Sequence, residues 1–532
     1  MGKETIPNSN IVERRRVMKR IRKLSRRIRQ LKYRCNELAH INRLPPELLI
    51  RIFLFLQSDF YEVQAGDYYR WTVVSHISRS WRALALGAKQ LWTGTSEDMS
   101  EVESPWVAAS LERSRPLKVD VVLRIDSREP QSRPIYCNPT TRTLCVNVVG
   151  HSCENYWGSS DIAERIRALE APALEEFELT GTDQFGEPED SADSDHSPPA
   201  LFNSCAPYLQ SIKIVGFNIS LGSIPFQGMT SLTLRYKHEH YGVLSFRALF
   251  DFLRMNPALR LLHLEYALLD ADDVDDDVPI HLPSLSSMTL FFPTRACIRL
   301  LSCLVVPPSC WAIIWGCSTP SDIRDVSSHI FFDAILSRLS NDPTEFNGLE
   351  FELGNDFVSF DLRRKIHWEN ETWAPEASIQ IRFISPADAD GISLTLPSLS
   401  SYSDVWSIQL CASPGGCSAS TIEALMSSLS LLPSLLEMQP LDSPFLLALS
   451  DHLYANPLSF TKLNKIDVFT EDGVTPPLDS IDRLARALSI RKESKGNPIG
   501  LILNDSCGWA ERGPYRDVLD RLRMVASELH IF

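Results

Sequence analysis

The residues whose types suit chemistry are few and scattered. His238, Glu239 and His240 adjoin one another, which is too close for the two-histidine metal face of a helix, so we expect a loop there. Cys411 and Cys417 flank a Pro-Gly-Gly segment, and one such pair without further ligands favours a simple turn. The sequence contains no nucleophile-elbow, zinc-protease, phosphate-loop or dinucleotide-binding motif. We therefore expect no catalytic residues, no cofactor and no bound metal.

Two acidic stretches predict exposed loops. Residues 270–278 have the composition of a calcium loop but lack its central glycine and its closing glutamate. Residues 183–199 are acidic, rich in serine and almost without apolar side chains. Neither stretch can bury enough apolar surface to form part of a core.

Composition limits the class of protein. A chain of 532 residues exceeds one ordinary domain, so we expect either several units or an extended repeat array. No apolar run reaches the length of about 18 residues that a membrane helix needs, and the N-terminus lacks a signal-peptide core. The 12 cysteines lack paired spacing, which favours reduced thiols. We expect no membrane association and a place in the cytoplasm, the nucleus or both.

Residues 1–40 predict a basic helix. Twelve Lys and Arg side chains lie between positions 14 and 34, although the whole chain has a net charge of -14. Apolar residues alternate here by four and three, the spacing of a coiled-coil seam. The seam consists of Val17, Ile21, Leu24, Ile28, Leu31, Cys35 and Leu38.

Several roles for this helix stay open. It could be a solvated helix that packs its seam on the rest of the chain, a coiled-coil contact, a nuclear import signal or a binder of phosphate backbones. Because Tyr33 is the one aromatic residue among the basic ones, we do not expect nucleic acid as a partner.

Residues 41–92 constrain function most. Pro45 and Pro46 suit the start of a helix, and eight of the ten residues from Glu47 to Leu56 are apolar. They divide into two stripes on roughly opposite sides of the helix, so one side can pack internally while the other needs a second surface. The broad stripe is Leu48, Leu49, Ile52, Phe53 and Leu56, and the narrow stripe is Ile50 and Leu54.

A second helix is predicted further along this segment, after a long polar connection at 58–70. Gly87 is a natural end for it, and Trp81 and Trp92 fit core anchors. Its apolar side consists of Val73, Val74, Ile77, Trp81, Leu84 and Ala85.

These residues resemble the F-box, a three-helix module that docks on the Skp adaptor of cullin-based ubiquitin ligases. The connection at 58–70 is longer and more polar than is usual in that family. The layout of the chain is similar to fungal F-box proteins in which the module precedes a leucine-rich region. The motifs that carry the resemblance are Leu44-Pro45-Pro46-Glu47-Leu48-Leu49, Ile52-Phe53, Val74, Ser78-Arg79, Trp81-Arg82, Ala85 and Leu91-Trp92.

The resemblance implies a non-catalytic subunit of a ubiquitin ligase. Its partners would be a Skp-family adaptor, through that adaptor a cullin, and an unidentified protein substrate. The adaptor-binding residues that it implies are Leu44, Pro45, Leu48, Leu49, Ile52 and Phe53, braced by Trp81 and Trp92.

A short sequence motif, which we call the repeated phrase, recurs beyond residue 104. It consists of proline, any residue, leucine, two residues, an apolar residue, any residue and leucine, and its end alternates as a strand does. Stretches with helical spacing lie between the copies, which recur at intervals of roughly 20 to 35 residues. In the sixth copy we expect Ile313 and Trp315 to point into the core. The copies begin at Pro172, Pro207, Met229, Pro257, Pro283 and Pro308, with a late member at Leu463.

The predicted fold class is therefore α/β. We expect a basic helix at 1–40, an F-box at 41–92 and, at 93–532, an irregular leucine-rich solenoid with a parallel curved sheet. A conventional α/β domain is the alternative to the solenoid. The expected function is a substrate-recognition adaptor of an SCF-type ligase. The alternatives are a leucine-rich scaffold or nuclear interaction protein without a ligase role and, third, an enzyme with an unrecognised site.

Overall fold

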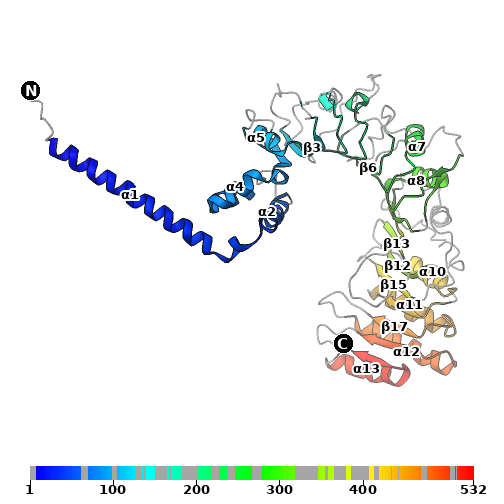
Figure 1. Cartoon of the computed structure of the whole chain (residues 1–532). Coiled ribbons are helices and arrows are strands. Elements are labelled where there is room, and N and C mark those ends of the chain that lie inside the picture. Colours follow the sequence, from blue (N-terminus) through cyan, green and yellow to red (C-terminus); the bar gives the residue numbers. More distant parts are fainter. Residues whose placement is uncertain are drawn as a thin grey trace, which may run out of the picture. The chain divides into compact units, whose positions relative to one another are not determined.

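The chain forms a mixed α/β structure with a large, mostly parallel sheet (Figure 1). It divides into two compact units, Met1–Trp157 with Leu169–Glu178 and Gly158–Ala168 with Leu179–Phe532. The computed structural model describes residues 8–61, 70–98, 105–126, 135, 139–149, 165–166, 169–181, 201–217, 227–235, 246–265, 278–307, 309–317, 346–353, 357–364, 379–384, 407–412, 419–432, 434–440, 443–468, 476–503, 510 and 512–531.

The first unit begins with helices and continues with parallel strands. Its helical elements are α1 (Asn8–Leu38), η1 (His40–Arg43), α2 (Pro46–Tyr61), η2 (Arg70–Val73), α3 (Val74–Ile77), α4 (Arg79–Gly87), η3 (Lys89–Trp92) and α5 (Pro105–Ser114). The strands β1 (Gly94–Asp98), β2 (Val119–Asp126) and β3 (Thr141–Val149) pair in parallel. The division between the two units falls within β4 (Glu176–Gly181).

The predicted helix at Val73–Ala85 is two helices separated by a break. Ser78 has an extended backbone, with φ -149° and ψ 163°, and its Oγ accepts a hydrogen bond from the Trp81 N–H at 3.1 Å. This cap satisfies one of the N–H groups that a helix start leaves unpaired. Val73, which ends η2, and Ile77, which ends α3, lie at the surface and not on a buried face, with more than half of each side chain exposed. Gly87 ends α4, as predicted.

The second unit contains the remaining strands and helices. Its strands are β5 (Ser211–Val215), β6 (Ser231–Arg235), β7 (Leu261–Glu265), β8 (Ile280–His281), β9 (Ser287–Pro293), β10 (Leu304–Val305), β11 (Trp311–Cys317), β12 (Phe346–Leu353), β13 (Phe357–Arg364), β14 (Ile379–Ile384), β15 (Ser407–Ala412), β16 (Glu437–Pro440), β17 (Lys465–Val468), β18 (Gly500–Leu503) and β19 (Leu529–Ile531). Its helical elements are η4 (Leu201–Ser204), α7 (Phe246–Met255), α8 (Thr294–Cys303), α10 (Ala419–Leu429), α11 (Ser443–Ala455), α12 (Leu478–Glu493) and α13 (Gly513–Val525).

Strands β5, β6, β7, β9 and β11 pair in parallel in that order. In β5, β6, β7 and β9 corresponding residues of successive phrases lie side by side, because each of these four strands begins at the same point of its phrase. In β11 the residue one position earlier in the phrase continues each row. One such buried row is Ile212, Leu232, Leu262, Met288 and Ala312, and each of these side chains is fully buried. The alternation within each phrase was therefore predicted correctly for β5, β6, β7 and β9.

A turn recurs before these strands. In six copies the buried residue at the first leucine position of the phrase donates its N–H to the carbonyl three residues earlier, over 3.0 to 3.2 Å. The turn gives the phrase a physical reason, because it buries one apolar side chain and directs the chain into the strand. The six donors are Leu174, Leu209, Leu259, Leu285, Cys310 and Leu463.

The sixth copy is out of register with the prediction. The turn ends at Cys310 as in the other copies, but the fully buried residues are Ala312 and Ile314 and not Ile313 and Trp315. One residue fewer separates turn and strand here, and a shift of one residue moves every side chain to the opposite face. Ile313 and Trp315 therefore lie on the other side of the sheet.

An antiparallel insertion follows β11. Strand β14 pairs in parallel with β11, β13 pairs antiparallel with both β14 and β12, and β12 pairs in parallel with β15. The chain thus runs through β12 and β13 before β14 returns to the side of β11. The sequence analysis did not predict this insertion.

A second parallel series runs from β15 through β16, β17 and β18 to β19. Its strand β16 carries a copy of the phrase that the sequence analysis missed, with Leu435 and Met438 buried. The helical spacings predicted between copies are confirmed. The buried faces include Phe246, Leu249, Phe250 and Leu253 on α7, Ile422, Leu425, Met426 and Leu429 on α10, and Ile481, Leu484 and Leu488 on α12.

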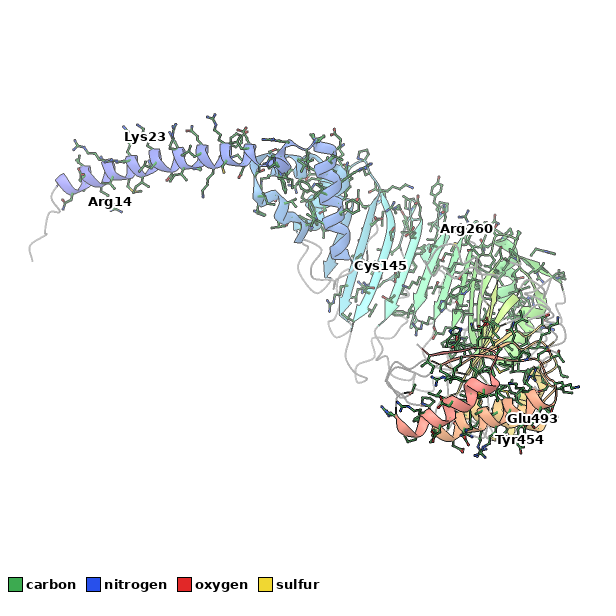
Figure 2. The ribbon with its side chains drawn as sticks, turned by 90° about the horizontal axis from the view of Figure 1, so that it is seen from below. Arg14, Lys23, Cys145, Arg260, Tyr454 and Glu493 are labelled. Carbon is green, nitrogen blue, oxygen red and sulfur yellow. The ribbon has the colours of Figure 1, made fainter. Side chains whose placement is uncertain are left out.

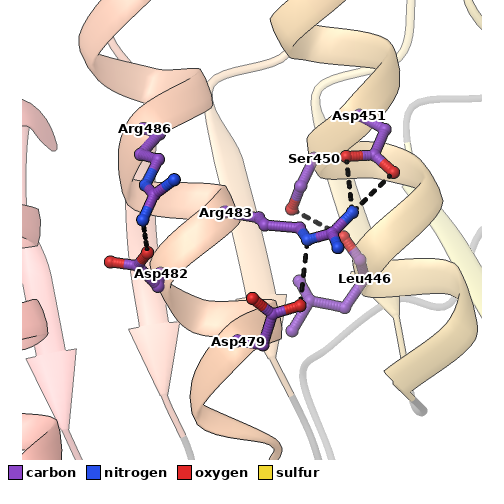
Figure 3. A network of polar contacts seen from close by, with 7 residues as sticks. All are labelled: Leu446, Ser450, Asp451, Asp479, Asp482, Arg483 and Arg486. Atoms are coloured by element: carbon purple, nitrogen blue, oxygen red, sulfur yellow. Dashed lines mark hydrogen bonds and ion pairs between the residues drawn. The ribbon is translucent and has the colours of Figure 1, made fainter.

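Polar contacts join α11 to α12 at the surface (Figure 3). The Arg483 guanidinium donates to Asp479 at 2.9 Å on its own helix and to Asp451 at 3.3 Å on α11. These side chains are largely exposed, so the pairing adds little free energy. Both helices also carry fully or nearly fully buried leucines, such as Leu449 on α11 and Leu484 on α12.

Several segments singled out in the sequence lie outside the described residues. They are the loops at 183–199 and 270–277, the segment 238–240, Cys417 and positions 62–69 of the polar connection. Among the helices that the structure describes, none combines the length and the apolar character needed to cross a membrane.

Candidate functional site

The candidate site lies on α2 and the elements packed against it. Leu49, Phe53 and Gln57, spaced by four residues, face inward and are each less than one-tenth exposed. They meet a group of residues that we call the aromatic cluster, because it includes three tryptophans. The cluster consists of Leu49, Phe53, Trp71, Val74, Trp81, Ala85, Ala88, Leu91 and Trp92.

Trp81 joins α4 to the segment that precedes α2. Its indole lies over the ring of Phe53, with the centroids 5.1 Å apart. Its Nε1 donates to the Asn42 side-chain oxygen at 2.5 Å, and the Asn42 amide in turn donates to the carbonyl of Asn36. A buried indole N–H needs such a partner. Trp81 therefore fixes the direction in which the chain enters α2.

Trp92 holds the opposite end of the cluster. Its Nε1 donates to the Ala85 carbonyl at 2.8 Å, and its ring packs against Trp71 and Trp106 with centroids 5.3 and 5.1 Å away. The guanidinium of Arg113 lies 4.4 Å from the centre of this ring. Trp71 and Trp106 did not figure in the sequence analysis, although the Pro-Trp pair at the start of α5 was a usable signal for Trp106.

One buried polar contact links two distant parts of the segment 41–92. The Gln57 amide donates to the Leu91 carbonyl at 3.3 Å, which connects the middle of α2 to η3. An unpaired buried amide would be destabilising, so this bond accounts for a polar residue on the inward face.

The outward face of α2 is apolar as well. Leu48 is 43% exposed, Leu56 36% and Phe55 71%, and Ile52 lies between them partly buried. On a helix these four residues form one stripe, which we call the α2 stripe. Ile50 and Leu54 pack against the aromatic cluster. The predicted broad stripe therefore divides between two faces: Leu49 and Phe53 face inward, whereas Leu48, Ile52 and Leu56 face outward. The sequence analysis did not assign Phe55 to a stripe, although it lies seven residues after Leu48 and so on the same side of the helix.

The eight predicted site residues divide by burial. Leu49, Phe53, Trp81 and Trp92 are buried in the cluster, Leu44 and Ile52 are partly buried against it, and Pro45 and Leu48 are exposed. The Pro45 carbonyl accepts hydrogen bonds from the N–H groups of Leu48 and Leu49, so it starts the helix. Pro45, Leu48 and Ile52 are accessible to a partner, while the fully buried members support them.

A second candidate surface lies on the face of the sheet in the second unit that is opposite the buried row. Arg235 forms an ion pair with Glu265 at 2.7 Å, and Glu265 lies beside Phe291 in the register of β7 and β9. Phe291 in turn packs edge-on against Trp315, with centroids 5.2 Å apart. Phe291 is only 8% exposed, so the side chains that a partner could reach here are Arg235, Glu265 and Trp315. Charged and aromatic groups of this kind are typical of protein-binding surfaces.

Among the described residues, no three His, Cys, Asp or Glu side chains gather in a way that could hold a metal ion. No protein-family model and no curated protein matches the chain in sequence. The proposal below rests on the two surfaces just described.

Proposed function

We propose that this chain is the substrate-recognition adaptor of an SCF-type cullin ubiquitin ligase, with α2 docking on a Skp-family adaptor. The observation that carries the proposal is the α2 stripe. Leu48, Phe55 and Leu56 are 43%, 71% and 36% exposed, whereas the opposite face of α2 is packed in the aromatic cluster. The motifs of residues 41–92 that resemble the F-box lie on these same elements.

The stripe has the energetic properties of a docking surface. Fully burying an exposed leucine side chain contributes about 1.5 to 3 kcal/mol. Leu48 and Leu56 are still 43% and 36% exposed, so docking would gain the remaining part of that free energy from each. The cluster beneath keeps the helix in one orientation, which lowers the entropy lost on binding. Pro45, at the start of α2, extends the same surface.

We further propose that residues 41–92 adopt the F-box arrangement and that the parallel strands beyond form an irregular leucine-rich solenoid. The recurring turn and the buried rows of β5 to β11 support this, because each strand completes its core only against its neighbours. The surface around Arg235, Glu265 and Trp315 would then hold a protein substrate. The chain would act by proximity, raising the effective concentration of substrate lysines near the ubiquitin thioester.

Co-purification from a eukaryotic lysate tests the proposal. The tagged full-length chain should retain a Skp-family protein and a cullin. The Leu48→Ala/Leu56→Ala variant should weaken this capture by about tenfold or more, because it removes exposed apolar contacts. Leu431→Ala, which truncates a leucine on the second unit that is 73% exposed, is the control and should capture normally.

The competing function is a leucine-rich scaffold or nuclear interaction protein without a ligase role. It is favoured if the wild-type chain retains no Skp-family protein while its aromatic cluster is folded, as judged by slow hydrogen exchange in α2 and α4. Equal capture by the wild type and the double variant would exclude the α2 stripe as the docking surface.

A further inference from the structure

Helix α1 carries an apolar seam that the described part of the chain leaves uncovered. Six of its members are 48% to 66% exposed, and the seventh, Cys35, is exposed as well. From Val17 to Leu38 the seam extends over about three heptads, or roughly 33 Å of helix. Hydrophobic side chains at this regular spacing bury their surface when a second helix packs along them.

The charges beside the seam restrict what that second helix can be. Arg20, Arg27 and Arg34 each precede a seam residue and form one flank, the position from which coiled coils select partners. The other flank is Met18, Ser25 and Lys32. The helix has twelve basic and two acidic side chains, and Figure 2 shows Arg14 and Lys23 extending away from its axis.

A second copy of α1 would pair poorly with the apolar seam. In a parallel pair Arg27 would face Lys32 of the other copy, and in an antiparallel pair Arg27 would face Arg27 and Arg20 would face Arg34. Each of these pairings sets like charges together, which destabilises a coiled coil. A partner helix with glutamate or aspartate at its flanks would turn all of them into attractive pairs.

Nucleic acid and membrane fit the helix less well. A phosphate backbone would use the basic side chains but leave the seven seam residues in water. A membrane surface favours a broad apolar face with bulky aromatic residues, whereas this seam is two positions wide in each heptad and contains no Trp or Phe.

We propose that α1 is the docking helix for an acidic amphipathic helix of another protein, paired through the seam and selected by Arg20, Arg27 and Arg34. The partner has apolar residues at seam spacing and carboxylates at the flanking positions. This contact is separate from the α2 stripe, so it gives the chain a second protein partner.

The test uses the full-length chain and two synthetic peptides as long as the seam. Both carry leucine at the seam positions, and their flanks carry glutamate in one and lysine in the other. Measured by fluorescence anisotropy, the glutamate peptide should bind at least about tenfold more tightly than the lysine peptide. The seam variant Ile28→Asn should lose this binding. Because Ile28 is exposed, the variant leaves the packing of the rest of the chain intact.

Two charge variants separate seam pairing from general attraction. Arg20→Glu/Arg27→Glu/Arg34→Glu should reverse the preference, so that the lysine peptide binds more tightly. Arg15→Glu/Arg22→Glu/Arg29→Glu makes the same change in net charge at positions away from the seam, and it should keep the preference for the glutamate peptide. Equal losses in both variants would overturn the proposal, since charge alone would then account for binding.

The other occupants are tested alongside. Tighter binding to duplex DNA or to phosphatidylserine vesicles than to the glutamate peptide, reduced equally by both charge variants, would overturn the proposal in favour of that ligand. A wild-type chain that sediments as a dimer, and as a monomer once Ile28→Asn is introduced, would identify a second copy as the occupant and also overturn it.

Discussion

The ring of Phe53 lies 5.1 Å from the indole of Trp81, at an angle of 54° between the two planes, so α2 and α4 meet through one aromatic contact. Phe53 has no exposed surface and Trp81 is only 6% exposed. This pair therefore supports the fold of the module, while Phe55, two residues further along α2, belongs to the surface. Adjacent apolar residues on one helix thus have separable roles.

This separation predicts different outcomes for two phenylalanine truncations. Phe53→Ala should destabilise the module by about 3 to 5 kcal/mol, because it opens a cavity beside Trp81. Phe55→Ala should leave its stability within about 0.5 kcal/mol of the wild type. Hydrogen exchange of the backbone amides in α2 and α4 measures the stability of the module in both variants. Similar protection in the two variants would contradict the assignment of Phe53 to the core.

Asn256 connects neighbouring copies of the repeated phrase. Its side-chain oxygen accepts from the Met229 N–H at 2.9 Å, and its amide donates to the Phe252 carbonyl at 2.9 Å. Asn256→Ala should cost about 1 to 3 kcal/mol in the free energy of unfolding, because the buried N–H of Met229 loses its acceptor. Urea denaturation measures the loss. Asn497→Ala, which removes an exposed side-chain hydrogen bond, is the control and should cost less.

Arg491 holds the chain between α11 and β17. Its guanidinium is 2% exposed and donates to the carbonyls of Pro457, Ser459, Phe460 and Asn497 over 2.6 to 3.1 Å, and burial lowers its pKa.

We expect Arg491→Lys to destabilise the second unit by about 2 to 4 kcal/mol, since an ammonium group cannot reach carbonyls on both sides of this site. Thermal unfolding compared with the exposed control Arg486→Lys measures the effect. Equal melting temperatures for the two variants would rule out this role for Arg491.

His452 predicts a pH dependence of stability. Burial lowers its pKa below the ordinary value of 6.5, opposed by the weaker attraction of Glu423, and its ring packs against Phe460. The unfolded chain then takes up a proton at a higher pH than the folded chain. The contribution of neutral His452 to the free energy of unfolding is therefore complete above about pH 6.5, and it is lost progressively as the pH falls below that value.

The measurement is the free energy of unfolding of the wild type and of His452→Gln between about pH 7.5 and pH 5.5. The variant should show a shallower fall in stability toward acid. A wild-type slope in His452→Gln would contradict the prediction.

The register of β11 is tested by two neighbouring isoleucines. Ile314 is fully buried, whereas Ile313 lies on the opposite face. Ile314→Ala should therefore cost about 2 to 5 kcal/mol, and Ile313→Ala less than about 1 kcal/mol. Chemical denaturation decides between the two registers, because the register expected from the sequence predicts the reverse order.

Local patterns in the sequence predicted much of this protein. The alternation of Leu262 and Leu264 indicated a strand with one buried face, and the spacing of Ile481, Leu484 and Leu488 indicated a buried helix face. Both are confirmed, because each depends on neighbours within a few residues. The break at Ser78 was missed, since its cap depends on one hydroxyl and not on periodicity. The antiparallel insertion of β12 to β14 has no local signature either.

What the sequence by itself determined is the α/β class, the basic helix α1 and most strands of the repeated phrase, because these follow from periodicity and composition. Only the tertiary structure decided which side of α2 stays exposed, that Trp71 and Trp106 join Trp92, and that β11 is shifted by one residue. The physical reason is that burial depends on side chains brought together from distant parts of the chain. An apolar stripe in the sequence indicates that its side chains pack against a second surface, but only the tertiary structure shows which surface that is.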